Sequence, residues 1–344
     1  MPALFSYTMI VAQISQKGGP FELVERPIPE PGHGEVLIKI DACGVCHSDA
    51  IFKDGNWPGM KYPFVCGHEV AGRVEKIGAQ FSRFKVGQRA GVGWNGGYCS
   101  HCAPCREGEF PYCTTGATTA VAFDGGYGEY MVAPETAVAA MPEELDPVEA
   151  GPLLCAGVTT YNALQKSGAK SGDLVAIQGI GGLGHLAVQF AAKSGYHTVA
   201  ISRGADKEAF AKELGAHEYI DDTNGDAAEQ LQKLGGAKVI LATAPSGKAI
   251  SSLVGGLKYK SKLVIVAAPH DNINVSALPL IMGSREIAGH YSGYSKDSED
   301  TLNFAALTGI RPKVEVFPLA KVNEAYERML SNKARFRVVL KMGS

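Results

Sequence analysis

The sequence predicts an α/β protein in two parts, an irregular β-rich lobe followed by a doubly wound parallel sheet. Three observations lead to this fold class. Short apolar segments broken by Gly and Pro fill the first part, regular alternation of strands and helices begins near Gly172, and a glycine-rich turn stands at the first strand-to-helix junction. Such alternation is typical of a parallel sheet covered by helices.

Each expected element is a short apolar run between turn residues, and the strands are rich in Val, Ile and Leu. The expected strands are residues 35–40, 70–77, 174–178, 198–202, 238–243 and 262–268, with a first helix over 182–194. After the last of these strands the chain returns to an irregular tail.

Composition indicates an enzyme that acts on small molecules. With 344 residues and 45% hydrophobic content, the chain can fill two cores. A net charge of −2 favours neither a nucleic-acid partner nor an anionic membrane. The N-terminus resembles no signal peptide and no apolar run is long enough to cross a bilayer, so a cytoplasmic location is expected.

A split set of metal ligands points to catalysis. Cys46, His68 with Glu69, and Cys155 are the residue types that bind zinc, and Cys155 precedes the glycine-rich turn. Two thiolates and an imidazole leave the fourth tetrahedral position of zinc open, as a catalytic site requires. The arrangement predicts a metal site that works with a redox cofactor.

Four further cysteines, Cys99, Cys102, Cys105 and Cys113, lie within fifteen residues. This CxxCxxCx₇C spacing suits a closed, structural zinc site, although free thiols or an iron–sulfur cluster remain alternatives. The bacterial ferredoxin run has a shorter last gap and a Pro after the final Cys, and both features are missing here. The two remaining cysteines, Cys43 and Cys66, are expected to be buried thiols.

The glycine-rich turn is Gly179-Ile-Gly181-Gly182-Leu183-Gly184. Between a strand and a helix, this GxGxxG pattern predicts a dinucleotide site, because backbone N–H groups at the helix start can approach a pyrophosphate. A tight structural turn is the alternative.

The end of the second expected strand bears on the choice of cofactor. An acidic residue there would bind the ribose hydroxyls of NAD, but this chain has Ser202-Arg203. A hydroxyl and a guanidinium can bind a 2′-phosphate that a carboxylate would repel. We therefore expect preference for NADP(H), with NAD(H) as the alternative if Arg203 is only a solvated side chain.

These motifs, in this order, resemble the zinc-containing alcohol dehydrogenases of the medium-chain dehydrogenase/reductase superfamily. The resemblance covers essentially the whole chain and rests on Cys43-Gly-Val-Cys46-His47-Ser48-Asp49, Gly67-His68-Glu69, the four-cysteine lobe, Cys155-Ala-Gly-Val-Thr159 and the glycine-rich turn. It implies a GroES-like catalytic domain over residues 1–154 and 294–344, with a structural zinc lobe near 95–115. It also implies a Rossmann domain over 155–293 and a homodimer or homotetramer.

The resemblance also implies roles for the residues around the catalytic zinc. Cys46, His68 and Cys155 match its ligands, and Glu69 matches a transient or supporting ligand. Asp49 matches the carboxylate that orients the ligand histidine, with a helix cap as the alternative.

Four residues match family positions near the cofactor and the reacting hydroxyl. Ser48 matches the hydroxyl that takes the alcohol proton, and His47 a contact to the pyrophosphate. Thr159 matches a residue that packs on the nicotinamide. Arg337 matches a C-terminal pyrophosphate contact, with a solvated strand end as the alternative.

Three further positions concern the substrate and its proton. Trp57 and Trp94 match aromatic walls of the alcohol pocket, with core packing as the alternative. Ile51 stands where several relatives carry a histidine that completes the proton relay. An aliphatic side chain cannot pass a proton, so the relay must take another route.

The expected function is reversible hydride transfer between a primary alcohol, aliphatic or aromatic, and NAD(P)⁺, with one catalytic and one structural zinc per chain. The alternatives within the superfamily are a cinnamyl-alcohol-type reductase and a polyol dehydrogenase. A nucleotide-binding structural or sensor protein is the alternative outside enzymes. The physiological substrate and direction do not follow from these motifs.

Overall fold

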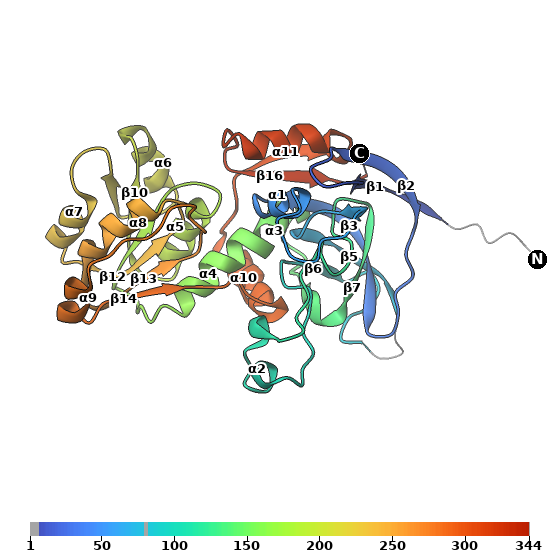
Figure 1. Cartoon of the computed structure of the whole chain (residues 1–344), viewed down its shortest axis with the longest axis horizontal. Helices are drawn as coiled ribbons and strands as arrows, with labels where there is room; N and C mark the ends of the chain where they lie inside the picture. The colour runs from blue at the N-terminus through green and yellow to red at the C-terminus, as the bar shows by residue number, and fades with distance from the viewer. Residues whose placement is uncertain (1–6, 79–81, 344) are drawn as a thin grey trace, which may run out of the picture. The chain divides into compact units, whose positions relative to one another are not determined.

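The computed structural model describes residues 7–78 and 82–343, and its chain forms two compact units (Figure 1). The first unit contains the chain up to Cys155, then Gly293–Leu307 and the chain from Arg311 onward. The second contains Ala156–Ser292 and Thr308–Ile310. The chain thus leaves the first unit after Cys155 and returns to it at Gly293, apart from the three residues Thr308–Ile310.

The first unit is built on two β-sheets. The smaller has the order β2-β1-β4, and the larger the order β15-β16-β3-β5-β6-β8 with β7 paired to β3. The strands are β1 Thr8–Ile14, β2 Phe21–Pro27, β3 Glu35–Val45, β4 Phe64–Val65, β5 Val70–Ile77, β6 Arg89–Val92, β7 Tyr130–Pro134, β8 Val138–Ala140, β15 Val314–Pro318 and β16 Arg337–Lys341. Only β15 and β16 pair in parallel; the other pairings are antiparallel.

Short helices connect these strands, and two longer ones lie in the returning segment. They are α1 Ser48–Lys53, α2 Ala103–Arg106, α3 Pro147–Pro152, α10 Ser295–Thr308 and α11 Val322–Leu330. Single helical turns cover η1 Phe110–Tyr112, η2 Glu135–Ala137, η3 Leu153–Gly157 and η6 Leu319–Lys321. Figure 1 shows α2 at the end of a loop that extends away from the sheets of its unit.

The second unit is a six-stranded parallel sheet with the order β11-β10-β9-β12-β13-β14. Its elements are β9 Leu174–Gln178, β10 His197–Ser202, β11 Glu218–Asp221, β12 Ala237–Ala242, β13 Leu257–Ile265, β14 Glu286–Gly289, α4 Val158–Gln165, α5 Gly184–Lys193, η4 Ala205–Lys207, α6 Glu208–Glu213, α7 Ala227–Lys233, α8 Gly247–Leu253, η5 Val254–Gly256 and α9 Ala277–Gly283. The strand order reverses between β9 and β12, which is the doubly wound Rossmann topology. The predicted fold class is confirmed.

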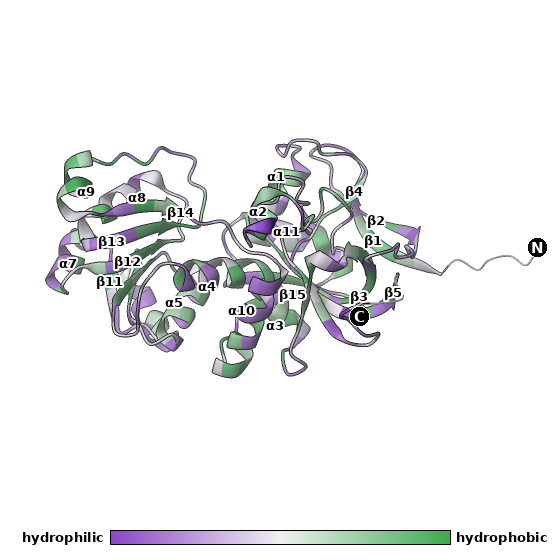
Figure 2. Cartoon of the chain, turned by 90° about the horizontal axis from the view of Figure 1, so that it is seen from below, coloured by the Kyte–Doolittle hydropathy of each residue, from purple (hydrophilic) through white to green (hydrophobic). Residues whose placement is uncertain are grey.

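The central strands of this sheet are buried on both faces. Every residue of β9 is buried, and so are all but the first residue of β10. Their continuous apolar runs are the pattern expected of parallel strands between helices. Figure 2 shows hydrophobic colouring along much of this sheet and hydrophilic colouring on α7. Among the described residues, no helix is long and apolar enough to cross a membrane.

Candidate active site

The structure brings Cys46, His68, Glu69 and Cys155 together inside the first unit. Cys46 directly follows β3, His68 and Glu69 lie between β4 and β5, and Cys155 lies in the helical turn η3. One donor atom from each residue lies within 4.8 Å of the others. His68 and Glu69 are completely buried, and the sulfur atoms of Cys46 and Cys155 are 3.9 Å apart.

The chemistry of this cluster fits a divalent metal. His68 Nε2 and Glu69 Oε2 are buried without a hydrogen-bond partner among the described residues. Such atoms are costly to bury unless a ligand satisfies them. The hydrogen bond between the two thiols lowers the pKa of Cys46 and raises that of Cys155, so the pair retains a proton that a bound cation would displace.

Asp49 fixes the orientation of His68. Its Oδ1 lies 3.1 Å from His68 Nδ1, and its Oδ2 accepts hydrogen bonds from the backbone N–H of Cys46 at 2.9 Å and from Tyr127 Oη at 2.7 Å. Burial disfavours the imidazolium, but the Asp49 carboxylate and the Cys46 sulfur together outweigh burial and raise the pKa of His68. The contact to Nδ1 leaves Nε2 facing the metal cluster.

Tyr127 was not predicted from the sequence. It lies in a Gly-rich stretch between β6 and β7, and no spacing relates it to the ligand motifs. Only the folded chain brings its hydroxyl to Asp49.

Glu69 forms a buried ion pair with Arg337, the first residue of β16. Burial raises the pKa of Glu69 to about 7, although the guanidinium opposes this shift. Arg337 is only 5% exposed, which excludes the alternative of a solvated strand end. Its Nε has no hydrogen-bond partner among the described residues, so the predicted contact to a pyrophosphate stays a prediction.

The residues expected to contact the cofactor and to take the alcohol proton lie at the start of helix α1. Ser48 is its first residue and is half-buried, whereas the preceding His47 is exposed. Ile51 is 38% exposed, and no titratable group replaces the relay histidine at this position.

Trp94 lies beside the metal cluster, and Trp57 packs against Trp94. The ring of Trp94 is 5.1 Å from His68 in an edge-to-face arrangement, 5.2 Å from Phe52 and 5.4 Å from Trp57. Both indoles are half-buried, so each combines core packing with some exposed surface. The predicted role as pocket walls is compatible with this placement.

The second cysteine cluster has the geometry of a closed metal site. The sulfur atoms of Cys99, Cys102, Cys105 and Cys113 lie within 4.8 Å of one another. Backbone N–H groups point at these sulfurs, from Cys102 to Cys99 at 3.4 Å and from Cys99 to Cys113 at 3.3 Å. Backbone donors at His101 and Cys102 lower the pKa of Cys99 to about 5. These backbone donors favour a thiolate at Cys99.

The other two cysteines are completely buried free thiols, as expected. Burial raises the pKa of both Cys43 and Cys66, so neither is an obvious nucleophile.

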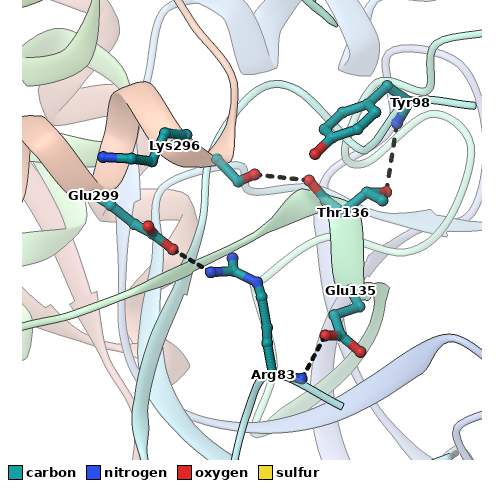
Figure 3. A pocket seen from close by; sticks show the side chains of 7 residues that line it. Arg83, Tyr98, Glu135, Thr136, Lys296 and Glu299 are labelled. Carbon is teal, nitrogen blue, oxygen red and sulfur yellow. Dashed lines mark hydrogen bonds and ion pairs between the residues drawn. The ribbon is translucent and has the colours of Figure 1, made fainter. Parts of the chain in front are cut away.

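A polar pocket of about 360 Å³ lies between the cysteine lobe and the start of α10 (Figure 3). The side chain of Arg83 pairs with Glu299 at 2.7 Å, and its backbone N–H donates to Glu135 at 2.9 Å. Ser295 donates to the carbonyl oxygen of Thr136 at 2.8 Å. The groups that line the pocket bind one another. Their bonds connect helix α10, which belongs to the segment returning to the first unit, with the rest of that unit.

In the second unit, the glycine-rich turn links β9 to α5 as predicted, and Leu183 directly precedes the first residue of α5. A side chain at Gly184 would collide with the carbonyl oxygen of Gly179, so the helix can approach the turn only with glycine there. This close approach fits the dinucleotide fingerprint.

The predicted selectivity residues lie at the end of β10. Ser202 is buried, and its Oγ accepts a hydrogen bond from Lys207 Nζ at 3.3 Å. Lys207 was not predicted, although a lysine five residues after the strand could have been noticed. Thr159 donates to Ser292 at 2.8 Å within the same unit.

Comparison with known proteins agrees with this site. Residues 32–143 match the alcohol dehydrogenase GroES-like domain, and residues 182–306 match the zinc-binding dehydrogenase domain. The chain is 41% identical over 331 residues to the alcohol dehydrogenase notN of Aspergillus sp. (strain MF297-2), covering 96% of this chain and 97% of the relative.

Two solved structures share the fold over nearly the whole chain. A cinnamyl alcohol dehydrogenase (SbCAD4) from Sorghum bicolor has a TM-score of 0.87 at 31% identity and covers 97% of each chain. A CAD from Helicobacter pylori complexed with NADP(H) has a TM-score of 0.84 at 27% identity, covering 97% of this chain and 98% of that chain.

These matches support zinc and a nicotinamide cofactor, and they favour an enzyme over a structural or sensor protein. The chain belongs to the zinc-type alcohol dehydrogenases of the medium-chain dehydrogenase/reductase superfamily, and it is an oxidoreductase with alcohol dehydrogenase activity.

Proposed function

We propose that the chain interconverts primary alcohols and aldehydes with NADP(H) as its preferred cofactor. The observation that carries this proposal is the buried cluster of Cys46, His68 and Cys155, in which His68 Nε2 has no hydrogen-bond partner among the described residues and the His68 ring lies edge-to-face with Trp94. These three residues would hold a catalytic zinc, with Glu69 as a supporting ligand, and the four cysteines of the lobe would hold a second zinc.

When bound, zinc supplies a Lewis acid that favours loss of the alcohol proton and polarises an aldehyde carbonyl. In the proposed mechanism the chain provides the surroundings of this chemistry. Ser48 accepts the alcohol proton, and Asp49 holds His68 in the orientation that leaves Nε2 for the metal. Trp57 and Trp94 line the alcohol pocket and narrow it.

The proton has no histidine at position 51 to receive it. Since Ile51 cannot take part, we propose that Ser48 would release the proton to water or to another base. His47 and Arg337 would contact the pyrophosphate, and Thr159 would pack on the nicotinamide, as the family resemblance implies.

Three residues support the preference for NADP(H). Ser202 and Lys207 are hydrogen-bonded to each other, and Arg203 follows directly in the sequence. One hydroxyl and two cations suit the 2′-phosphate of the adenosine ribose, which Lys and Arg both bind well. The Helicobacter pylori relative was solved with NADP(H).

The test is the initial rate of benzaldehyde reduction by the zinc-loaded protein with NADPH and with NADH. We expect NADPH to be the better cofactor, with Ser202→Asp shifting the efficiency ratio toward NADH and Lys207→Ala weakening NADPH alone. Lys212→Ala is the matched control, because Lys212 pairs with the carbonyl of His217 rather than with Ser202. Preference for NADH in the unaltered protein would refute the cofactor assignment and leave the zinc assignment standing.

The substrate class within the family is the finer part of the proposal. A cinnamyl-alcohol-type reductase is the nearest alternative, given the similarity to the Sorghum bicolor enzyme. Comparing cinnamaldehyde with a short aliphatic aldehyde separates the two. A polyol dehydrogenase is disfavoured by the indole of Trp94 beside His68 and that of Trp57 packed against it, and greater activity on sorbitol than on a primary alcohol would contradict our choice.

We further propose a cytoplasmic homodimer or homotetramer with the domain limits given above, 1–154 with 294–344 and 155–293. Two features of the second unit support self-association. Strand β14 lies at the end of its sheet, and α9 exposes Leu278, Ile281 and Met282 by 65%, 71% and 79%. Light scattering coupled to gel filtration measures the assembly, and a monomer at micromolar concentration would contradict this part.

A further inference from the structure

Tyr127 is one of the largest completely buried side chains in the first unit. Its hydroxyl donates a 2.7 Å hydrogen bond to Asp49 Oδ2. No other feature of the sequence or the family resemblance assigns this tyrosine a task.

The Asp49 carboxylate receives hydrogen bonds in an asymmetric way. Oδ2 accepts from both Tyr127 Oη and the backbone N–H of Cys46, while Oδ1 faces His68 Nδ1. Two donors on one oxygen hold the carboxylate plane in place. The other oxygen is thereby aimed at the imidazole, whose Nε2 lies in the metal cluster.

The Tyr127 hydroxyl is itself held firmly. The backbone N–H of Tyr127 donates to Cys66, its carbonyl accepts from Ala12 at 2.7 Å, and its ring packs 5.6 Å from Phe21. A Cβ at Gly67, which has φ +102°, would lie 2.5 Å from ring atom Cδ1 of Tyr127. The glycine that precedes His68 therefore makes room for this ring.

A buried tyrosine needs a partner for its hydroxyl, and a backbone carbonyl often serves. Tyr62 uses one in this way, with its hydroxyl 3.1 Å from the carbonyl of Phe52. The Tyr127 hydroxyl instead donates to the carboxylate of Asp49, which orients His68, a proposed metal ligand. Groups that hold a ligand histidine typically change metal affinity by about 10–100-fold when removed.

We propose that Tyr127 is a positioning residue of the catalytic zinc site, acting through Asp49 to keep His68 Nε2 aimed at the metal. This inference rests on the proposed zinc ligation by Cys46, His68 and Cys155. The Tyr127 hydroxyl reaches the metal cluster through Asp49, so its effect is expected on metal retention first and on turnover only as a consequence.

The experiment follows transfer of zinc from the full-length, zinc-loaded protein to a chromogenic chelator. Zinc release from the unaltered protein is compared with release from His68→Ala. The kinetic phase that the variant lacks is assigned to zinc held by the proposed catalytic cluster. Tyr127→Phe removes only the hydroxyl, and we expect it to accelerate this phase by about tenfold. Tyr326→Phe is the matched control, because Tyr326 is also buried against Phe21 but does not donate to Asp49, and we expect a change below about twofold.

A double-mutant cycle separates positioning from general packing. In the Asp49→Ala background, Tyr127→Phe should no longer alter the zinc-release phase, because the side chain through which Tyr127 acts is gone. An unchanged phase in Tyr127→Phe, or the same acceleration in the Asp49→Ala background, would overturn the inference while leaving the zinc site intact. If His68→Ala removes no phase, both this inference and the proposed zinc ligation are wrong.

Discussion

The two cysteine clusters of the first unit differ in how the chain assembles them. The lobe collects four thiols from one stretch, in which Cys113 lies only 14 positions after Cys99, and backbone N–H groups of the same stretch face its sulfurs. The other cluster joins Cys46 to Cys155, 109 residues later, and surrounds them with buried charges, among them Asp49 and Arg337. A local site suits a structural task, whereas a site assembled by the fold can place different groups around a reacting molecule.

The strongest test of this contrast removes His68, because the cluster of Cys46 and Cys155 includes a histidine and the four-cysteine lobe does not. His68→Ala should lower kcat/KM for aldehyde reduction by at least about a thousandfold, or about 4 kcal/mol, because the metal that polarises the carbonyl is lost. Metal analysis should show one zinc per chain in place of two. His101→Ala, in the lobe but outside both donor sets, is the control, and full activity in His68→Ala would contradict the assignment.

The reciprocal change removes a ligand from the lobe. Cys102→Ser should release the other zinc and lower the melting temperature by roughly 5–10 °C, because a structural metal contributes its binding energy to folding. Activity per folded molecule should stay within about threefold, since no lobe residue belongs to the candidate active site. Cys66→Ala, which changes a buried thiol outside both clusters, should keep both zinc ions.

The thiols of the lobe should also differ in reactivity once metal is removed. The pKa of Cys99 is lowered to about 5, so its thiolate is present above that pH, and the bonds that stabilise it are lost as pH falls through about 5. Alkylation of Cys99 by iodoacetamide should therefore be nearly constant from pH 6 to 8, whereas an ordinary thiol gains about tenfold per pH unit.

Cys105 supplies the internal control for that experiment. It is buried, and burial raises its pKa to about 12, so it should stay unmodified over the same pH range. Peptide mass spectrometry reports both sites at once, and equal rates would show that the lobe does not favour a thiolate at Cys99.

The smallest expected effect concerns Ile51, the position at which several relatives carry a relay histidine. Ile51→His should raise alcohol oxidation a few-fold at low pH, where proton loss is hardest, because a histidine can pass the proton to water. Ile51 is 38% exposed, so the new side chain needs no repacking. An unaltered pH–rate profile would indicate that another group already serves the relay.

Much of the fold could be read from local sequence. The strands β9 and β10 were predicted because a parallel strand buried on both faces is a continuous apolar run. The lobe was equally readable, since its four ligands are close in sequence. The expected helix over 182–194 begins two residues later, at Gly184, because the glycine-rich turn uses the first two residues.

What the sequence determined was the set of chemical groups: the spacing of the cysteines, the His68-Glu69 pair, and the glycines of the nucleotide turn. Tertiary structure alone decided that Tyr127 meets Asp49, that Arg337 pairs with Glu69, and that Lys207 joins Ser202. The physical reason is that a periodic pattern or a short motif reports contacts between near neighbours, whereas a buried polar side chain takes its partner from whichever distant segment the packing brings within hydrogen-bond reach.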